Sequence, residues 1–201
     1  MKKAIILSLA LSLIFLSCKK EKTEDPPSGN TETPLKTAVE AKTPADTIYS
    51  QANSPANFGF KFYSNTAGTI RKLGCRMPAA GNYTVTLWDF ATGASLAQTT
   101  VTVTDAGQFA YSAITPVVAI SENTRYVISV NNTIGGVGKP YFQLFKKPNT
   151  AINIYPFTKG RITIEAPLYK GGATPVMPNQ NNASDFPFMR GVADLEIDFL
   201  M

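Results

Sequence analysis

Apolar and polar residues alternate with a period of two along most of the chain after residue 46. The run NFGFKFY at 57–63, for example, places a phenylalanine at every second position. Turn-forming residues separate such runs at spacings of about 8–12 residues, and no window has a convincing helical period. This pattern predicts an all-β fold, an antiparallel β-sandwich whose strand order (jelly-roll or immunoglobulin-like) stays open. The expected strands are 57–63, 69–77, 81–93 with its turn, 96–103, 109–114, an edge strand at 116–120, 125–131, 141–145, 161–165 and 192–199.

The stretch GNYTVTLWDFATG at 81–93 places the single tryptophan on the less apolar side of its strand. Tyr83, Val85 and Leu87 share one side and should point between the sheets, so Trp88 should lie on the opposite face. Two interpretations remain open. Trp88 is either an exposed platform on which a sugar ring could stack, or a residue covered by the long aromatic-rich segment 139–191.

The chain closes with a regular strand from Val192 to Phe199. One side of it carries Ala193, Leu195, Ile197 and Phe199, and the other carries Asp194, Glu196 and Asp198. A solvated outer face explains these acidic residues best, although three carboxylates joined by loop carbonyls could also bind calcium. A strand this regular predicts that the C-terminal segment is integral to the sheet.

The first residues have the pattern of an export signal. Lys2 and Lys3 precede a short, mostly apolar run at 4–16, which is too short to span a bilayer as a helix. The sequence FLSC at 15–18 resembles the lipobox of bacterial lipoproteins, in which the cysteine is lipidated and becomes the new N-terminus. This resemblance implies a signal peptide at 1–17, a lipid on Cys18 and, since Lys19 follows the cysteine, sorting to the outer membrane of the cell envelope. Residues 18–45 then read as a lipidated cysteine with a flexible, proline-containing linker, and residues 46–201 as a single β-sandwich domain.

Composition removes several kinds of function. The chain has no histidine and only two cysteines, so Ser-His-Asp and Cys-His nucleophilic sites and zinc sites rich in histidine or cysteine are excluded. The net charge of +5 is scattered and forms no basic stripe, which argues against nucleic-acid binding. Cys75 alternates with Leu73 and Met77 and should be a buried, inert thiol. We therefore expect no catalytic residues, no metal and no cofactor.

Several motifs together resemble one family of bacterial extracytoplasmic proteins, the domain of unknown function 4082. They are FGFKF at 58–62, AGTI at 67–70, VTLW at 85–88 with Gly93 and LA at 96–97, TPV at 115–117, NTRYVIS at 123–129, and the final strand. The resemblance covers nearly all of 47–199. It implies a β-sandwich on a secreted or surface protein and carries no catalytic residues.

These observations predict a lipid-anchored envelope module that binds a ligand and is not an enzyme. One hypothesis is glycan binding around Trp88 and Asp89, with Tyr155, Phe157, Tyr169 and Asn181 supplying side walls or hydroxyl contacts. The alternative is a structural or adhesion lipoprotein that contacts another protein, through the edge strand near Pro116 or through an apolar patch. The expected partners are thus the membrane, through the lipid on Cys18, and a glycan or a surface protein.

Overall fold

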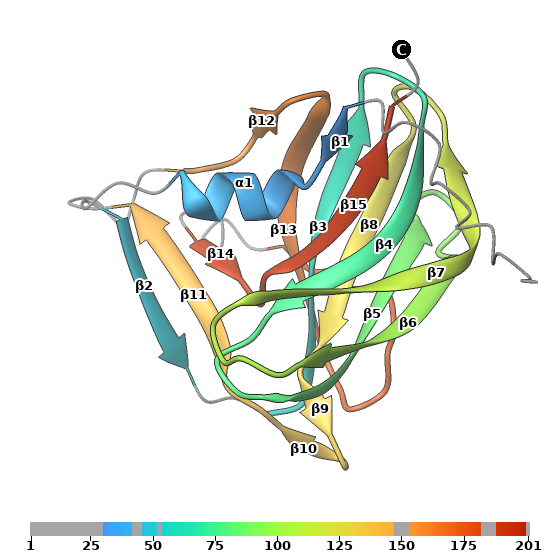
Figure 1. Ribbon diagram of the computed structural model, residues 1–201. Coiled ribbons are helices and arrows are strands. Elements are labelled where there is room, and N and C mark those ends of the chain that lie inside the picture. Colours follow the sequence, from blue (N-terminus) through green and yellow to red (C-terminus); the bar gives the residue numbers. More distant parts are fainter. Residues whose placement is uncertain (1–29, 42–45, 52–53, 147–152, 182–187, 200–201) are drawn as a thin grey trace, which may run out of the picture.

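The computed structural model describes residues 30–41, 46–51, 54–146, 153–181 and 188–199 (Figure 1). Most of these residues form antiparallel strands, as predicted, and the two largest sheets pack face to face as a β-sandwich. The signal peptide predicted at 1–17 and Cys18 lie outside the described residues. The elements are β1 (Thr31–Glu32), α1 (Pro34–Glu40), β2 (Asp46–Gln51), β3 (Ala56–Ser64), β4 (Gly68–Arg76), β5 (Gly81–Asp89), β6 (Ser95–Val103), β7 (Phe109–Ile120), β8 (Arg125–Asn131), β9 (Thr133–Ile134), β10 (Val137–Gly138), β11 (Tyr141–Lys146), β12 (Phe157–Lys159), β13 (Ile162–Gly171), β14 (Phe188–Arg190) and β15 (Ala193–Asp198).

The sandwich is built from a six-stranded sheet, in the order β12-β13-β3-β8-β5-β6, and a four-stranded sheet, in the order β1-β15-β4-β7. A third sheet, β14-β11-β2, and the β9-β10 hairpin complete the described strands. The segments predicted at 109–114 and 116–120 form one strand, β7, with a register irregularity opposite β4. β7 is an edge of the four-stranded sheet, as the proline at 116 indicated.

The core lies between the two large sheets and follows the predicted alternation. Tyr83, Val85 and Leu87 of β5 are fully buried there. Phe58, Phe60 and Phe62 of β3 lie in the same cluster, as do the apolar residues of the closing strand β15. Cys75 is also buried, and burial raises the pKa of its thiol to about 12. The buried thiol expected from the sequence is therefore confirmed.

Residues 30–41 differ from the flexible linker that the sequence predicted. They form a strap, which we define as β1 together with α1. β1 pairs with β15, and α1 contacts β15 and β12, so the strap lies across one open side of the sandwich (Figure 1). Leu35 and Val39, four positions apart on one face of the helix, are 0 % and 2 % exposed. A helix of seven residues is too short to be stable alone, so its packing against the sandwich supplies its stability.

Asp194 explains where the strap docks. Its carboxylate accepts hydrogen bonds from the backbone N–H groups of Leu35 (3.0 Å) and Lys36 (2.8 Å) at the start of α1, and from the Tyr111 hydroxyl (2.8 Å). The sequence placed Asp194 on a solvated face, and this was wrong, because the strap covers that part of β15 and leaves the residue fully buried. Burial raises the pKa of Asp194 to about 6, against the lowering effect of the hydrogen bonds that it accepts.

Candidate functional site

Trp88 is covered, and its ring offers no free face for stacking. The residue is only 8 % exposed and packs with Val127 and Leu168, with Phe90 and Met177 around them. Its indole N–H donates a hydrogen bond of 2.8 Å to Oγ of Ser129. Of the two interpretations of this residue, the covered one is correct. Leu168 and Met177 of the predicted covering segment, 139–191, pack on Trp88, although these two side chains are not aromatic.

The cover over Trp88 is the segment 171–181, which folds back across the outer face of the six-stranded sheet. Asn57 donates a hydrogen bond to the carbonyl of Thr174 (3.1 Å), and Asn131 donates one to the carbonyl of Gly172 (3.2 Å). Backbone hydrogen bonds in both directions, of 2.8 and 3.1 Å, join Tyr169 to Gln180. Because polar groups of the sheet bind the backbone of this segment directly, the cover is an integral layer of the fold.

The other residues of the predicted glycan site do not gather around Trp88. Asp89 accepts hydrogen bonds from the backbone and side chain of Thr92 in the turn after β5, and these bonds lower the pKa of its carboxyl. Tyr155, 5 % exposed, stacks on Phe60 with ring centroids 6.3 Å apart. Phe157 lies beside Tyr155, Tyr169 packs on Phe58, and Asn181 is exposed on a loop. Tyr155, Phe157 and Tyr169 thus pack on the main core, whereas Trp88 belongs to a separate cluster.

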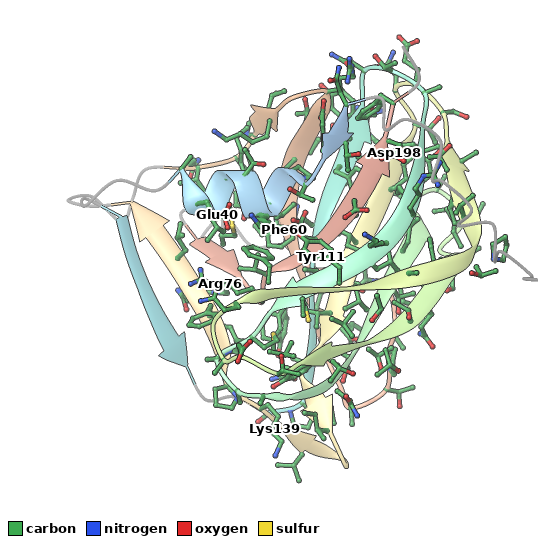
Figure 2. All side chains as sticks on the ribbon, in the orientation of Figure 1. Glu40, Phe60, Arg76, Tyr111, Lys139 and Asp198 are labelled. Carbon is green, nitrogen blue, oxygen red and sulfur yellow. The ribbon has the colours of Figure 1, made fainter. Side chains whose placement is uncertain are left out.

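A surface cleft lies elsewhere, between the end of α1 and the ends of β4 and β7. We call it the Arg76 cleft, and its volume is about 120 Å³. Figure 2 shows Glu40 on α1 above Arg76, which lies at the end of β4. The cleft is lined by Val39, Glu40, Arg76, Gly107, Gln108 and Phe109.

Three contacts hold the guanidinium of Arg76 in one place. Its Nε donates a hydrogen bond of 2.6 Å to the carbonyl of Gly107. Its Cζ lies 4.8 Å from the ring centroid of Phe142 and 5.9 Å from that of Phe109. Gly107 adopts a φ of 81°, which favours glycine, and its N–H donates to the carbonyl of Met77 (2.8 Å), so the turn that holds the arginine is itself fixed.

The charge of Arg76 is not neutralised by a direct partner. Within the described part of the chain, no carboxylate oxygen lies within 4.0 Å of its nitrogens, and its terminal nitrogens make no hydrogen bond. Glu40, across the cleft, is paired with Lys36 at 2.6 Å. Burial lowers the pKa of Arg76, while the nearby charge of Glu40 acts in the opposite direction. The cleft therefore presents a fixed, half-buried cation beside the apolar side chains of Val39 and Phe109.

The outer face of the four-stranded sheet connects this cleft to the strap. The ring of Tyr111 lies so close to Gly74 that a Cβ there would overlap it, so the ring covers the glycine directly. Phe109 stacks beside Tyr111 with ring centroids 6.3 Å apart, and the Tyr111 hydroxyl binds Asp194. One continuous set of contacts thus runs from the cleft to the carboxylate that holds α1.

The acidic residues of β15 go to separate partners. Asp194 binds the strap, Glu196 pairs with Lys72 at 2.9 Å, and Asp198 pairs with Arg71 and accepts a hydrogen bond from Thr31. Among the residues that the structure describes, no group of three His, Cys, Asp or Glu residues is placed to hold a metal ion. The calcium interpretation of this face thus has no support in the geometry.

Sequence reasoning missed the Arg76 cleft. The alternation at 73–77 does place Arg76 opposite the buried side of its strand, so its outward direction could be read from the sequence. Its neighbours come from α1, the β6–β7 turn and β11, and no local pattern joins these segments.

Together, the fold and the cleft define a β-sandwich domain with a small cationic cleft beside an N-terminal strap. The family profile of a domain of unknown function, DUF4082, matches residues 41–187, and the chain belongs to this family. No curated protein matches the chain. The match includes Arg76, Gln108 and Phe109 and begins just after α1, a few residues before the start of the resemblance expected over 47–199. It ends before β15, so the closing strand that the resemblance included lies outside the match. Among the described residues, no helix is both long and apolar enough to cross a membrane.

Proposed function

We propose that the protein is a lipid-anchored binding module of the bacterial cell envelope, attached through Cys18 to the outer membrane and without catalytic activity. The FLSC sequence at 15–18 and the charged, apolar start of the chain support the anchor. A single acyl chain would bind a membrane only weakly, whereas the thioether-linked diacylglyceryl group and added N-acyl chain of bacterial lipoproteins would make the attachment stable. The chain belongs to the DUF4082 family, and its resemblance to that family implied a secreted or surface protein. This implication supports a location in the cell envelope.

The observation that carries the binding role is the Arg76 cleft. It combines an apolar wall, formed by Phe109, with polar groups that converge on the same small space, Arg76, Gln108 and Glu40. Saccharide sites need both features, since a sugar ring offers apolar C–H faces and a rim of hydroxyl groups. We therefore move the glycan-binding hypothesis from Trp88, which is covered, to this cleft.

The binding role can be tested on the mature chain from Cys18 with the substitution Cys18→Ser, which leaves every described residue in place. Backbone amide NMR shifts would be followed during titration with oligosaccharides of the bacterial surface. We expect shifts at Gly107, Gln108 and Phe109, and their loss in Arg76→Ala. Arg125→Ala is the matched control, because Arg125 also lies over an aromatic ring, 5.7 Å from the centroid of Tyr63, but is paired with Glu165 away from the cleft. Shifts confined to the surface around Arg125, or none with any saccharide, would exclude a glycan site in the cleft.

A second candidate function is contact with another protein through β7. Among the described strands, β7 forms one edge of the four-stranded sheet. Val117, beside Pro116 in this strand, is 49 % exposed. An exposed edge strand can pair with a strand of a partner. If this edge is the interface, Val117→Lys should abolish cell-surface adhesion or complex formation while leaving saccharide titrations unchanged, whereas Arg76→Ala should do the reverse.

The lipid anchor has a test of its own. Cells expressing the chain would be labelled with a radioactive or alkyne-bearing fatty acid and fractionated. We expect label on the wild type, recovery in the outer-membrane fraction, and loss of both with Cys18→Ser. An unlabelled wild-type protein recovered in the soluble periplasmic fraction would refute lipid attachment.

A further inference from the structure

We propose that the Arg76 cleft recognises the carboxylate of an acidic sugar, that is, a uronic acid residue of a surface glycan. This inference rests on the proposed function, because it names the ligand class of the same cleft. Its basis is the state of the arginine: half-buried, held rigidly, and without a carboxylate partner among the described residues.

The rigidity of Arg76 matters because it lowers the entropy lost on binding. A guanidinium presents its N–H donors in a planar fork that matches a carboxylate. Here Nε is used by the carbonyl of Gly107, and the rings of Phe142 and Phe109 restrict the plane. The two terminal nitrogens keep their donors for a ligand, so the cleft already has the geometry that an anion needs.

Desolvation favours an anionic ligand over a neutral one. Burial lowers the pKa of Arg76 through the loss of water around the cation, and a bound carboxylate would restore a strong partner in place of that water. Glu40 does not fill this role, because it lies beyond ion-pair distance and is occupied by Lys36. Hydrogen bonds between charged partners are stronger than those to neutral groups, and the difference predicts about tenfold to a hundredfold tighter binding of an acidic sugar than of its neutral counterpart.

The size and lining of the cleft set the rest of the ligand. A volume of about 120 Å³ is well below that of sites for drug-sized molecules (about 300–1,000 Å³), so the cleft holds no more than one terminal sugar unit and the remainder of the glycan stays outside. The half-buried ring of Phe109 can contact the C–H face of the sugar ring. The amide of Gln108 and the carboxylate of Glu40 can bind its hydroxyl groups.

The test compares matched sugars on the mature chain carrying Cys18→Ser. Glucuronate and galacturonate, as monosaccharides and short oligomers, would be titrated against glucose and galactose of equal length, followed by calorimetry and amide NMR. A tripeptide with a free carboxyl terminus and free glutamate form a further arm, since an amino-acid carboxylate could also pair with Arg76. We expect the uronates to bind at the cleft at least tenfold more tightly than the neutral sugars and the peptide, with affinity that falls as salt is added.

Variants separate the role of the guanidinium from that of the fold. Arg76→Gln should remove the preference for uronates, and Arg76→Lys should keep part of it, because lysine retains the charge but loses the fork. Arg125→Gln, on the other sheet, should change neither the affinity for uronates nor the affinity for neutral sugars. Thermal unfolding of each variant shows whether the domain remains folded.

The outcomes distinguish this inference from the proposed function. Equal binding of acidic and neutral sugars at the cleft would overturn the carboxylate preference and leave glycan binding in place. Tighter binding of the peptide than of any sugar would overturn the assignment to a glycan while keeping the carboxylate site. Absence of every ligand from the cleft would overturn both.

Discussion

Replacing Leu35 by alanine tests whether the strap is part of the folded domain. Leu35 is fully buried in the main core, and truncating such a leucine costs about 2–5 kcal/mol when the surrounding structure cannot collapse into the space. The strap is a separate segment joined to the sandwich by docking contacts. Once substitutions have removed the docking free energy, the strap detaches from the sandwich. A further substitution in the strap then no longer lowers the free energy of unfolding. We therefore expect Leu35→Ala and Val39→Ala to be destabilising singly and less than additive together.

Native-state hydrogen exchange is the assay that reports the docking directly. The N–H groups of Leu35 and Lys36 donate to the buried carboxylate of Asp194, so they should be protected in the wild type. In Leu35→Ala they should exchange far faster, while amides in β5 keep their protection because the two large sheets stay folded. Lys36→Ala is the matched control. Lys36 lies on the same helix with a partly exposed side chain, and losing its pair with Glu40 should cost no more than about 0.5 kcal/mol.

Two results would refute this reasoning. The first is rapid exchange of the Leu35 and Lys36 amides in the wild type. The second is a chain beginning at Asp46 that unfolds at the same denaturant concentration as the chain beginning at Asn30. Either would return residues 30–41 to the role of a flexible linker.

Three further predictions follow from buried groups. Trp88 should emit at short wavelength and stay unshifted by any sugar, since its ring is covered; emission typical of water-exposed indole would contradict the cover at 171–181. The Cys75 thiol should resist alkylation in the native protein and react fully in denaturant, because burial raises its pKa to about 12; fast native labelling would contradict this. Asp194 has a folded-state pKa of about 6, above the value of about 3.9 in an unfolded chain. The folded state therefore holds the proton more tightly, so the stability that Asp194 contributes is lost as pH rises from about 4 through 6. The free energy of unfolding of the wild type, measured relative to Asp194→Asn, should fall over that window, and a rise would refute the assignment.

The strand pattern could be predicted because it is a local property. Alternation alone places Tyr83, Val85 and Leu87 in the core, and it also predicts that Trp88 faces the other way. Alternation cannot show whether that other face is exposed to solvent. The segment that covers Trp88 comes from 171–181, and its attachment depends on hydrogen bonds to Asn57, more than a hundred residues earlier in the chain.

The strap and the cleft were missed for the same reason. The spacing of Leu35 and Val39 is typical of a helix. Two apolar positions are too few to predict a helix unless the surface on which it packs is known. That surface is provided by Asp194, which is 159 positions from Leu35. The Arg76 cleft needs the strap in place before it exists, because Val39 and Glu40 form one of its walls. Long-range docking of a short segment therefore hid both features from the sequence pattern.

Docking of the strap also sets how far the domain could stand from a membrane. Eleven residues, Lys19 to Gly29, separate Cys18 from Asn30, and even fully extended they span no more than about 40 Å. With a lipid on Cys18, this short linker would keep the sandwich close to the bilayer surface. The seven residues of α1 add only about 10 Å between β1 and the Arg76 cleft. The cleft would then meet only ligands that lie close to that bilayer surface.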